Sequence, residues 1–366
     1  MFGIKTLSFV AALGFPFAAC ALDTSAGKVD ITPIVTGLDA PWAVGFLPGG
    51  ALVITERDGK LLFVEGGSIQ EVAGLPPIAA SGQGGLLDVL VPSDFESTRT
   101  IFLSYAKPQA RGAGTAMMRA VLSEDGSNLS DVKDIFELQP GSSGGRHFGS
   151  RIVEAPDGTL FLTIGDRGNR MSSQDLGTEN GAVVRVTKTG EIPADNPFTG
   201  NPIARPAIWS YGHRNPQGAT LDLDGNLLVV EHGAQGGDEI NRVKRGANYG
   251  WPIIAYGQHY GGGQIGQGTS RDGMEQPEYY WDPSMAPSGM MVYSGKLWPE
   301  WQGDVFVGSL KFNYISRLEG APLDEVERIE SDETLRVRDI REAPDGSIWF
   351  LSVGEGALYR MTPASG

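Results

Sequence analysis

The feature that most constrains the fold is a short pattern that occurs six times along the chain. Each copy consists of an apolar run, a tight turn, a second apolar run and a polar corner. Four clear copies cover residues 42–64, 151–166, 218–233 and 339–356, and two looser copies cover residues 87–107 and 288–310. The copies begin about 45 to 70 residues apart, and such a period is typical of a repeat architecture.

The turns and the composition indicate that each copy is a β-hairpin. Pro-Asp-Gly and Asp-Gly turns join the two runs, which are rich in branched residues and bounded by Gly and Asp. The 52 glycines and 23 prolines suit short strands with tight turns. Small sheets that cannot bury both faces alone pack into a ring, so the sequence predicts an all-β, six-bladed β-propeller. A two-sheet sandwich is the alternative, but a sandwich would not repeat one hairpin signature six times.

The N-terminus predicts an exported protein. Residues 1–21 combine Lys5, an apolar run from 7 to about 19, and small residues before a cleavage point, so they are interpreted as a signal peptide. Residues 22–366 are then predicted to form a single propeller domain in the periplasm or outside the cell. The run is shorter than the roughly 20 residues of a membrane span, and no span is predicted elsewhere. Lipid anchoring at Cys20 is an alternative, since its surroundings weakly resemble an acylation box.

The charge of the chain limits its partners. Twenty-nine basic and 44 acidic residues give a formal net charge of −15. Binding to nucleic acid needs a basic face, so a nucleic-acid partner is not predicted. An acidic balance is compatible with metal cations, but it identifies no ligand.

Propeller geometry predicts where polar chemistry gathers. Loops at one end of the blades converge on the central channel, so residues after the second run of each copy should meet, together with the loops that precede each copy. The four cations Arg214, Lys311, Arg336 and Arg338 come from three separate copies. Together they would form a site for a polyanion, because arginine pairs with carboxylate or phosphate through two parallel bonds. Taken singly, each would be interpreted as a surface salt bridge. Arg336 and Arg338 are expected to alternate on one strand and so to face the same side.

An acidic, Gly-rich loop follows the fourth copy and resembles a hard-cation site. Asp238 and Glu239 supply carboxylates, and the glycines at 233, 236 and 237 let backbone carbonyls turn inward, as calcium requires. Turn chemistry alone is the other interpretation.

His147 is the best candidate for a general base. Histidine titrates near neutral pH and needs an orienting partner, and Asp166 follows the next β run. His213 and His232 each adjoin a positioning motif, so structural hydrogen bonding is expected of both. The four histidines show no spacing typical of transition-metal ligation.

Several motifs together are similar to one known family. The segments GGRHFGSRI, TIGDRGN, WSYGHRNPQG and GGDEINRVKRGANYGWP resemble the soluble sugar dehydrogenases that depend on pyrroloquinoline quinone (PQQ). The match looks closer to the shorter branch, the aldose sugar dehydrogenases, and runs from about Leu38 to the end of the chain.

The resemblance implies a set of binding residues. PQQ carries three carboxylates, which Lys311, Arg336 and Arg338 would hold. Arg214 and Asn215 would also contact the cofactor, and Gln83 and Tyr260 would border it. One Ca²⁺ would bind the quinone through the carbonyls of Gly233 and Ala234. A second, structural Ca²⁺ is implied at Glu239 and the Tyr249 carbonyl.

The resemblance also implies a reaction. His147 would take the anomeric hydroxyl proton of an aldose while the C1 hydride moves to PQQ, giving a lactone. Asp166 would orient His147, Arg214 would stabilise the developing oxyanion, and an external acceptor would remove the electrons. The glucose enzymes have an acidic residue where this chain has Arg146, which puts tight glucose selectivity in doubt. Two alternatives remain open: a calcium-dependent propeller lactonase, and a non-catalytic propeller that binds a sugar or a protein.

Overall fold

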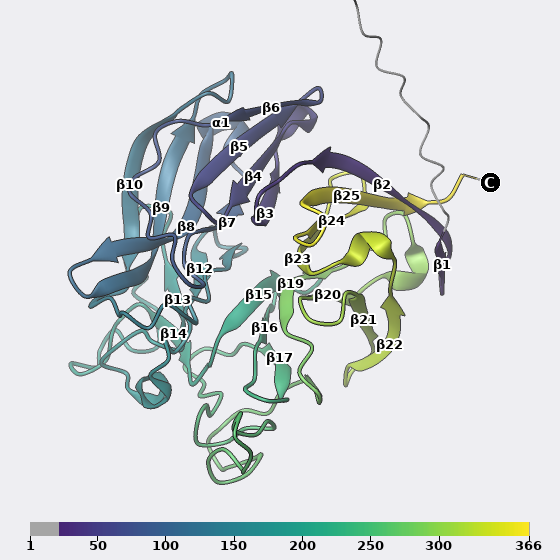
Figure 1. Cartoon of the computed structure of the whole chain (residues 1–366). Helices are drawn as coiled ribbons and strands as arrows, with labels where there is room; N and C mark the ends of the chain where they lie inside the picture. Colours follow the sequence, from purple (N-terminus) through teal and green to yellow (C-terminus); the bar gives the residue numbers. More distant parts are fainter. Residues whose placement is uncertain (1–21, 366) are drawn as a thin grey trace, which may run out of the picture.

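The computed structural model describes residues 22–365, which form six antiparallel sheets arranged in a ring (Figure 1). The first three blades, in chain order, consist of β3 (Pro41–Phe46), β4 (Leu52–Glu56), β5 (Lys60–Glu65) and β6 (Ser68–Glu71); β7 (Leu86–Leu90), β8 (Thr100–Gln109), β9 (Gly112–Leu122) and β10 (Leu129–Glu137); and β11 (Ile152–Glu154), β12 (Leu160–Thr163), β13 (Ala182–Val186) and β14 (Ile208–Tyr211).

The other three blades complete the ring. They consist of β15 (Pro216–Leu221), β16 (Leu227–Glu231), β17 (Asp238–Arg242) and β18 (Tyr279–Trp281); β19 (Pro287–Val292), β20 (Val305–Ser309), β21 (Ile315–Glu319) and β22 (Asp324–Ile329); and β23 (Val337–Glu342), β24 (Ile348–Ser352) and β25 (Ala357–Pro363), extended by β2 (Gly27–Thr36) and β1 (Leu22–Thr24). The helical elements described are short: α1 (Phe95–Thr98) and the 3₁₀ helices η1 (Pro48–Gly50), η2 (Arg170–Gln174), η3 (Pro299–Trp301) and η4 (Asp332–Thr334).

This architecture confirms the six-bladed propeller and rules out the sandwich. Each of the six sequence copies supplies the first two strands of one blade. The first strands β3, β7, β11, β15, β19 and β23 contact their neighbours around the ring, so they line its centre. The third and fourth strands lie further out, and apart from β5 of the first blade the sequence copies do not cover them.

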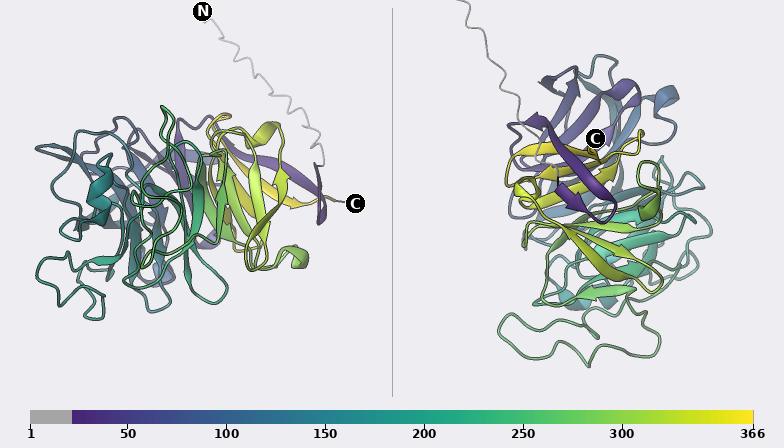
Figure 2. Two further views of the ribbon diagram at one scale, coloured as in Figure 1. Left: turned by 90° about the horizontal axis from the view of Figure 1, so that it is seen from below. Right: turned by 90° about the vertical axis from the view of Figure 1, so that its right-hand side faces the viewer.

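Both ends of the described chain belong to the sixth blade. β2 pairs with β25 in antiparallel register from Val29↔Pro363 to Thr36↔Ala357. Figure 2 shows β1 and β2 lying along the C-terminal strands. Strands from distant parts of the sequence therefore close the ring.

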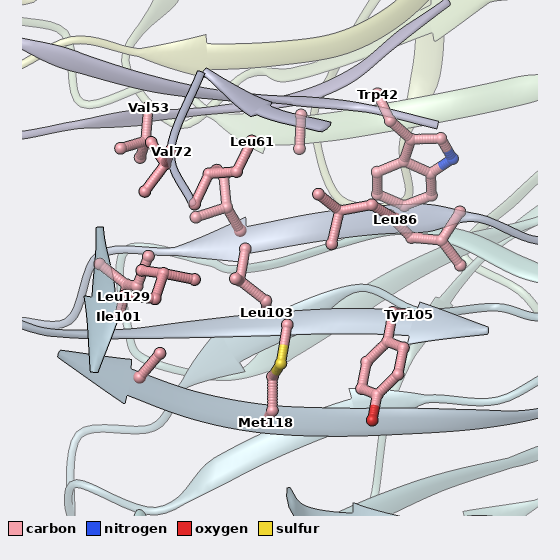
Figure 3. Close-up of a cluster of buried hydrophobic side chains, with 14 of the residues drawn as sticks. Trp42, Val53, Leu61, Val72, Leu86, Ile101, Leu103, Tyr105, Met118 and Leu129 are labelled. Atoms are coloured by element: carbon pink, nitrogen blue, oxygen red, sulfur yellow. The ribbon is translucent and has the colours of Figure 1, made fainter. Parts of the chain in front are cut away.

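The core lies between adjacent blades. Between the first two blades, Leu61 of β5 and Val53 of β4 face Leu86, Leu103 and Met118 of the second blade (Figure 3). Burying a side chain of this size contributes roughly 1.5–3 kcal/mol, so each interface between blades adds substantially to stability.

A network of four charged side chains crosses the central channel. Arg151 Nη1 lies 3.1 Å from Asp88 Oδ1 and 2.8 Å from Asp339 Oδ1. Arg341 contacts the same two carboxylates, with Nη2 2.7 Å from Asp88 Oδ1 and Nε 3.0 Å from Asp339 Oδ2. Asp88, Arg151 and Asp339 are buried. We refer to these four residues as the channel quartet, in which two cations balance two anions.

In residues 22–365 no helix is long and apolar enough to cross a membrane. The predicted signal peptide and Cys20 lie outside the part of the chain that the structure describes.

Candidate active site

One end of the ring holds a cavity of about 170 Å³ above the channel quartet, which we call the cation-lined cavity. Its walls are formed by residues that precede the inner strands, by the first residues of these strands and by residues that follow second strands. The lining residues are Trp42, Arg57, Gln83, Leu87, Phe148, Gly149, Asn215, Gln217, His232, Ala286, Leu310, Arg336 and Arg338. The convergence expected from the repeat pattern is therefore present.

Two arginines of this cavity, Arg336 and Arg338, have little negative charge beside them, whereas the guanidinium of Arg57 lies 3.7 Å from the carboxylate of Asp58. Arg336 donates to the Leu310 carbonyl (3.1 Å), and Arg338 donates to the Gln217 side-chain oxygen (3.0 Å). Within the described residues neither forms a salt bridge. Burial, and then the charges of Arg151, Arg336 and Arg57, lower the pKa of Arg338. Neutral acceptors alone do not compensate gathered cations, so the cavity fits an anion.

Two sequence expectations about these cations need correction. Arg336 does not lie on a strand with Arg338, because β23 begins at Val337 and Arg336 has a left-handed φ of 54°. Both residues line the cavity nevertheless. Lys311 does not line it: its side chain is exposed, with Nζ 3.3 Å from the Ser284 carbonyl and 4.7 Å from the Phe312 ring centroid. Lys311 thus lies beside the cavity wall residue Leu310, outside the cavity.

Arg214 and Asn215 are adjacent in sequence but line different cavities: Asn215 lines the cation-lined cavity, and Arg214 lines a cavity with the candidate base His147. The Arg214 side chain is buried, and its Nη1 donates to the His232 carbonyl (3.1 Å). Its Nε is buried without a hydrogen-bond partner. Asn215 Oδ1 accepts from the Gly149 N–H and from Gln217 Nε2, both at 3.3 Å. A buried donor without a partner is costly, which favours a bound acceptor at Arg214.

His147 and Asp166 form the predicted pair. His147 Nδ1 lies 2.6 Å from Asp166 Oδ1. Asp166 is fully buried and also accepts from the Gly168 N–H (2.7 Å) and from Trp251 Nε1 (2.8 Å). With Nδ1–H donated to the carboxylate, Nε2 of His147 carries the lone pair that a general base needs.

The electrostatics keep this pair in the required protonation states. Burial lowers the pKa of His147, and the charges of Arg214 and Arg146 lower it further, against the opposing effect of Asp166. For Asp166, burial acts to raise the pKa, but hydrogen bonds from His147, Gly168 and Trp251 outweigh it and hold the pKa below the ordinary value. At neutral pH the imidazole is therefore neutral and the carboxylate charged.

The backbone around His147 is unusual. His147 has a φ of 56°, and Gly145 and Gly149 on either side also have positive φ. A left-handed conformation costs a non-glycine residue roughly 1–2 kcal/mol. The neighbouring loop accommodates it at Gly165, where a Cβ would collide with the His147 carbonyl oxygen. His147 is further held by its N–H, which donates to Gln83 Oε1 (2.6 Å).

A second cavity of about 270 Å³ lies on the His147 side of Arg214, and we call it the base cavity. Its lining residues are Gln83, Arg146, His147, Asp166, Gly168, Arg170, Arg214, Trp251 and Tyr260. It shares Gln83 with the cation-lined cavity, as expected of a residue that borders both. Tyr260 is 72% exposed and lies at its edge.

The predicted calcium ligands meet at a third, small cavity of about 20 Å³. Gly233, Ala234, Glu239 and Tyr249 all line it, together with Glu231 and Arg214. Burial, and then the charge of Glu231, raise the pKa of Glu239. Its carboxylate accepts from Asn241 Nδ2 (3.0 Å), and the Asn241 side-chain oxygen is itself buried without a partner. Uncompensated oxygen atoms of this kind fit a hard cation.

Two observations limit that interpretation. Asp238 was expected to supply a carboxylate to the cation, but its two oxygens accept from the Gly233 N–H (2.8 Å), the Ser284 hydroxyl (2.7 Å) and the Ala286 N–H (2.8 Å). Asp238 therefore fixes the loop. In residues 22–365 no group of three or more His, Cys, Asp or Glu side chains is placed to hold a metal ion. A cation here would need backbone carbonyls among its ligands.

The remaining histidines make hydrogen bonds within the protein. His213 is buried, with Nε2 2.9 Å from the Ser210 hydroxyl and Nδ1 2.8 Å from Glu231 Oε1. His232 Nε2 lies 2.7 Å from the Pro287 carbonyl. Both arrangements agree with structural roles. His259 Nδ1 lies 2.9 Å from Arg170 Nη1, at the base cavity.

Sequence reasoning missed several wall residues, of which Arg57 is the most informative. Arg57 directly follows β4, the second strand of the first blade, as His232 follows β16. The rule that residues after second strands converge would have identified it. No such positional rule identifies Trp251 or Gln217 as wall residues, although both lie in the motifs that carry the family resemblance.

Comparisons with known proteins agree with this geometry. A family model described as Glucose / Sorbosone dehydrogenase matches residues 38–360. Aldose sugar dehydrogenase YliI of Escherichia coli is 40% identical over 353 residues, covering 94% of this chain and 95% of that protein.

Solved structures give the same result. The apo-form of the soluble aldose sugar dehydrogenase from Escherichia coli superposes with a TM-score of 0.88 at 40% identity, covering 92% of this chain and 100% of that one. The PQQ-bound aldose sugar dehydrogenase from Streptomyces coelicolor gives a TM-score of 0.74 at 26% identity, covering 92% and 98%.

Proposed function

The chain belongs to the glucose/sorbosone dehydrogenase family and is an oxidoreductase, and from that premise we propose that it oxidises aldose sugars at C1 to lactones, using PQQ and calcium. The observation that carries the proposal is the juxtaposition of two sites. The base cavity holds His147 with its own carboxylate, Asp166, and it shares the wall residue Gln83 with the cavity that Arg336 and Arg338 line. An external acceptor would then remove the electrons.

The cation-lined cavity suits PQQ because the cofactor has three carboxylates. Arg336 and Arg338 would hold it, with Asn215, Gln83 and Arg214 beside it, and Tyr260 at the edge. Lys311 would reach it only if its exposed side chain moved from Ser284. Carbonyls of Gly233 and Ala234 would provide calcium ligands, and Glu239 with the Tyr249 carbonyl would provide a second set. When bound, PQQ would accept the hydride and calcium would polarise it as a Lewis acid.

The protein's own residues would manage the proton and the developing charge. His147 Nε2 would accept the proton of the anomeric hydroxyl, while Nδ1–H stays bonded to Asp166. Asp166 would stabilise the imidazolium that forms and keep the ring in one orientation. Arg214, buried with an unpartnered Nε, would stabilise negative charge on the substrate oxygen.

The other functions considered from sequence are less favoured. A lactonase would need the acidic loop but not the unpaired arginines. A non-catalytic propeller would not need a buried carboxylate that orients a neutral histidine. Family membership and the intact His147–Asp166 pair both support the dehydrogenase. We also propose that the protein is located in the periplasm or outside the cell.

Reconstitution tests the proposal directly. Purified protein freed of cofactor and metal is titrated with PQQ and Ca²⁺, and reduction of a dye is followed across a panel of aldoses. We expect oxidation only when both are added, and chelation before reconstitution should abolish it. Full activity with NAD and without PQQ would contradict the proposal.

A further inference from the structure

The base cavity carries more positive charge than the proposed reaction needs. Three guanidinium groups line it, from Arg146, Arg170 and Arg214, against the single carboxylate of Asp166. That carboxylate already accepts from His147, Gly168 and Trp251. Within the described residues none of the three arginines forms a salt bridge. The proposed reaction assigns a role to Arg214 and leaves Arg146 and Arg170 without one.

Arg170 is held at the wall of the cavity. Its Nη1 lies 2.9 Å from His259 Nδ1, and its guanidinium lies 5.5 Å from the centroid of the Trp251 ring. A ring nitrogen of His259 and the aromatic face of Trp251 position this group, and neither carries the negative charge that would neutralise it. The charge of Arg170 is therefore available to a ligand.

Arg146 lies next to the base in sequence and near it in space. Its guanidinium packs over Gly168, where a Cβ would come within 2.6 Å of Arg146 Nε. Its charge is one of those that lower the pKa of His147. The side chain is exposed at the mouth of the cavity. A substrate whose C1 hydroxyl reaches His147 would place its remaining carbons among Arg146, Arg170 and Trp251.

We propose that Arg146 and Arg170 form an anion-binding subsite of the base cavity, and that the preferred substrates are aldoses bearing an acidic group away from C1. This inference rests on the proposed function and names its substrate class. Guanidinium groups pair with planar carboxylates through two parallel hydrogen bonds, and they also bind phosphate. Hexuronic acids and hexose phosphates share this chemistry. On a chain of net charge −15, such a subsite also offsets long-range repulsion of an anionic substrate.

The test compares sugars that differ at one carbon. The enzyme loaded with PQQ and Ca²⁺ is assayed with glucuronate against glucose and with galacturonate against galactose, and glucose 6-phosphate distinguishes phosphate from carboxylate. We expect kcat/KM for the anionic member to exceed that of its neutral partner by about 10- to 100-fold, as one charge-assisted hydrogen bond allows. In Arg146→Gln and Arg170→Gln that ratio should fall toward one. In Lys133→Gln, which removes an exposed charge from β10, the ratio should be retained.

Binding without oxidation gives an independent measurement. Methyl glucuronide and methyl glucoside have a blocked C1, so calorimetry on the loaded protein reports their affinity alone. Tighter binding of the glucuronide, lost in the Arg146 and Arg170 variants, would support the subsite even if no sugar were oxidised. Equal affinities, and an unchanged ratio of kcat/KM in both variants, would overturn the subsite while leaving the dehydrogenase proposal intact. No oxidation of any aldose would contradict the dehydrogenase proposal instead.

Discussion

The channel quartet and the cation-lined cavity are neighbours with opposite charge arrangements. In the quartet, Arg151 and Arg341 meet Asp88 and Asp339, so two cations balance two anions. In the cavity above, Arg336 and Arg338 have only neutral acceptors. Arg151 joins the two regions, since its Nη2 donates to the Arg338 carbonyl at 3.0 Å.

The contrast distinguishes the channel quartet, which stabilises the ring, from the arginines of the cation-lined cavity, which would bind a ligand. The quartet links β7, β11 and β23 across the channel, and Asp88 also accepts from the Ile152 N–H at 2.8 Å. A balanced, buried network of this kind fixes geometry, and removing one partner is expensive. Unpaired arginines that line a cavity cost stability until an anion binds. The following predictions test this division, from the largest expected effect to the smallest.

The first prediction concerns the His147–Asp166 pair of the base cavity. His147→Gln removes the base but not the cations of the neighbouring cavity, so PQQ should still bind. Reduction of bound PQQ by excess aldose should slow by about 10²- to 10⁴-fold, the usual contribution of a positioned general base. Asp166→Asn should slow it less, because the base remains. Stopped-flow absorbance measures both rates, and a wild-type rate in His147→Gln would remove that residue from the mechanism.

The second prediction breaks the quartet. Arg151→Met leaves Asp88 and Asp339 buried with one cation between them, so the free energy of unfolding should fall by about 3–5 kcal/mol. Arg338→Met is the control, because it removes a half-buried arginine that forms no salt bridge within the described residues. In the cofactor-free protein it should cost far less, since it relieves repulsion from Arg151 and Arg336. Urea denaturation of both variants measures the difference, and equal losses would show that the two regions are not distinct.

The third prediction concerns the ligand itself. Arg338→Ala should raise the PQQ concentration for half-saturation by about 10- to 100-fold, because a charge-assisted hydrogen bond contributes roughly 1.5–3 kcal/mol. Lys311→Ala should have a smaller effect, since Lys311 lies outside the cavity. Equilibrium titration of the apo-protein gives both values. A larger effect for Lys311 would mean that its side chain moves inward on binding.

The fold was largely predictable because its information is local. Each hairpin specifies two adjacent strands, and six copies of the hairpin pattern leave few architectures. The closure of the ring was not predictable in this way, because β2 pairs with β25 more than 300 residues later. Neither strand pattern identifies the other as its partner.

The site was predictable where a residue follows a repeated strand or belongs to a specific motif. His147, Asp166 and Arg214 meet in the base cavity, and Arg336 and Arg338 meet in the cation-lined cavity. The roles of Asp238 and Lys311 could not be read from sequence, because they depend on which neighbours satisfy them. Ser284 and Ala286 engage Asp238, and the Ser284 carbonyl accepts from Lys311. Which groups contact Asp238 and Lys311 depends on how the loops fold.

The last prediction concerns the titration of His147, whose pKa is affected both by arginines that form no ion pair within the described residues and by the carboxylate of Asp166. Burial and the unpaired Arg214 and Arg146 lower its pKa, and the paired Asp166 opposes them. In the cofactor-free protein its NMR titration midpoint should therefore lie below about 6.5, the ordinary value. Arg146→Gln should raise the midpoint, whereas Asp166→Asn should lower it further.

The lowered pKa of His147 also makes the free energy of unfolding depend on pH. Because the folded pKa lies below the unfolded one, the unfolded chain binds the proton more readily. The stability that neutral His147 contributes is thus complete above about pH 6.5 and is lost as the pH falls through its folded pKa. Replacing His147 with Gln should make the free energy of unfolding less dependent on pH in that window. Two results would contradict this: an equal dependence of the free energy of unfolding on pH in both proteins, or an NMR midpoint above about 6.5. Either result would show that Asp166 at least offsets the arginines in setting the pKa of His147, against the division between balanced and unbalanced charges.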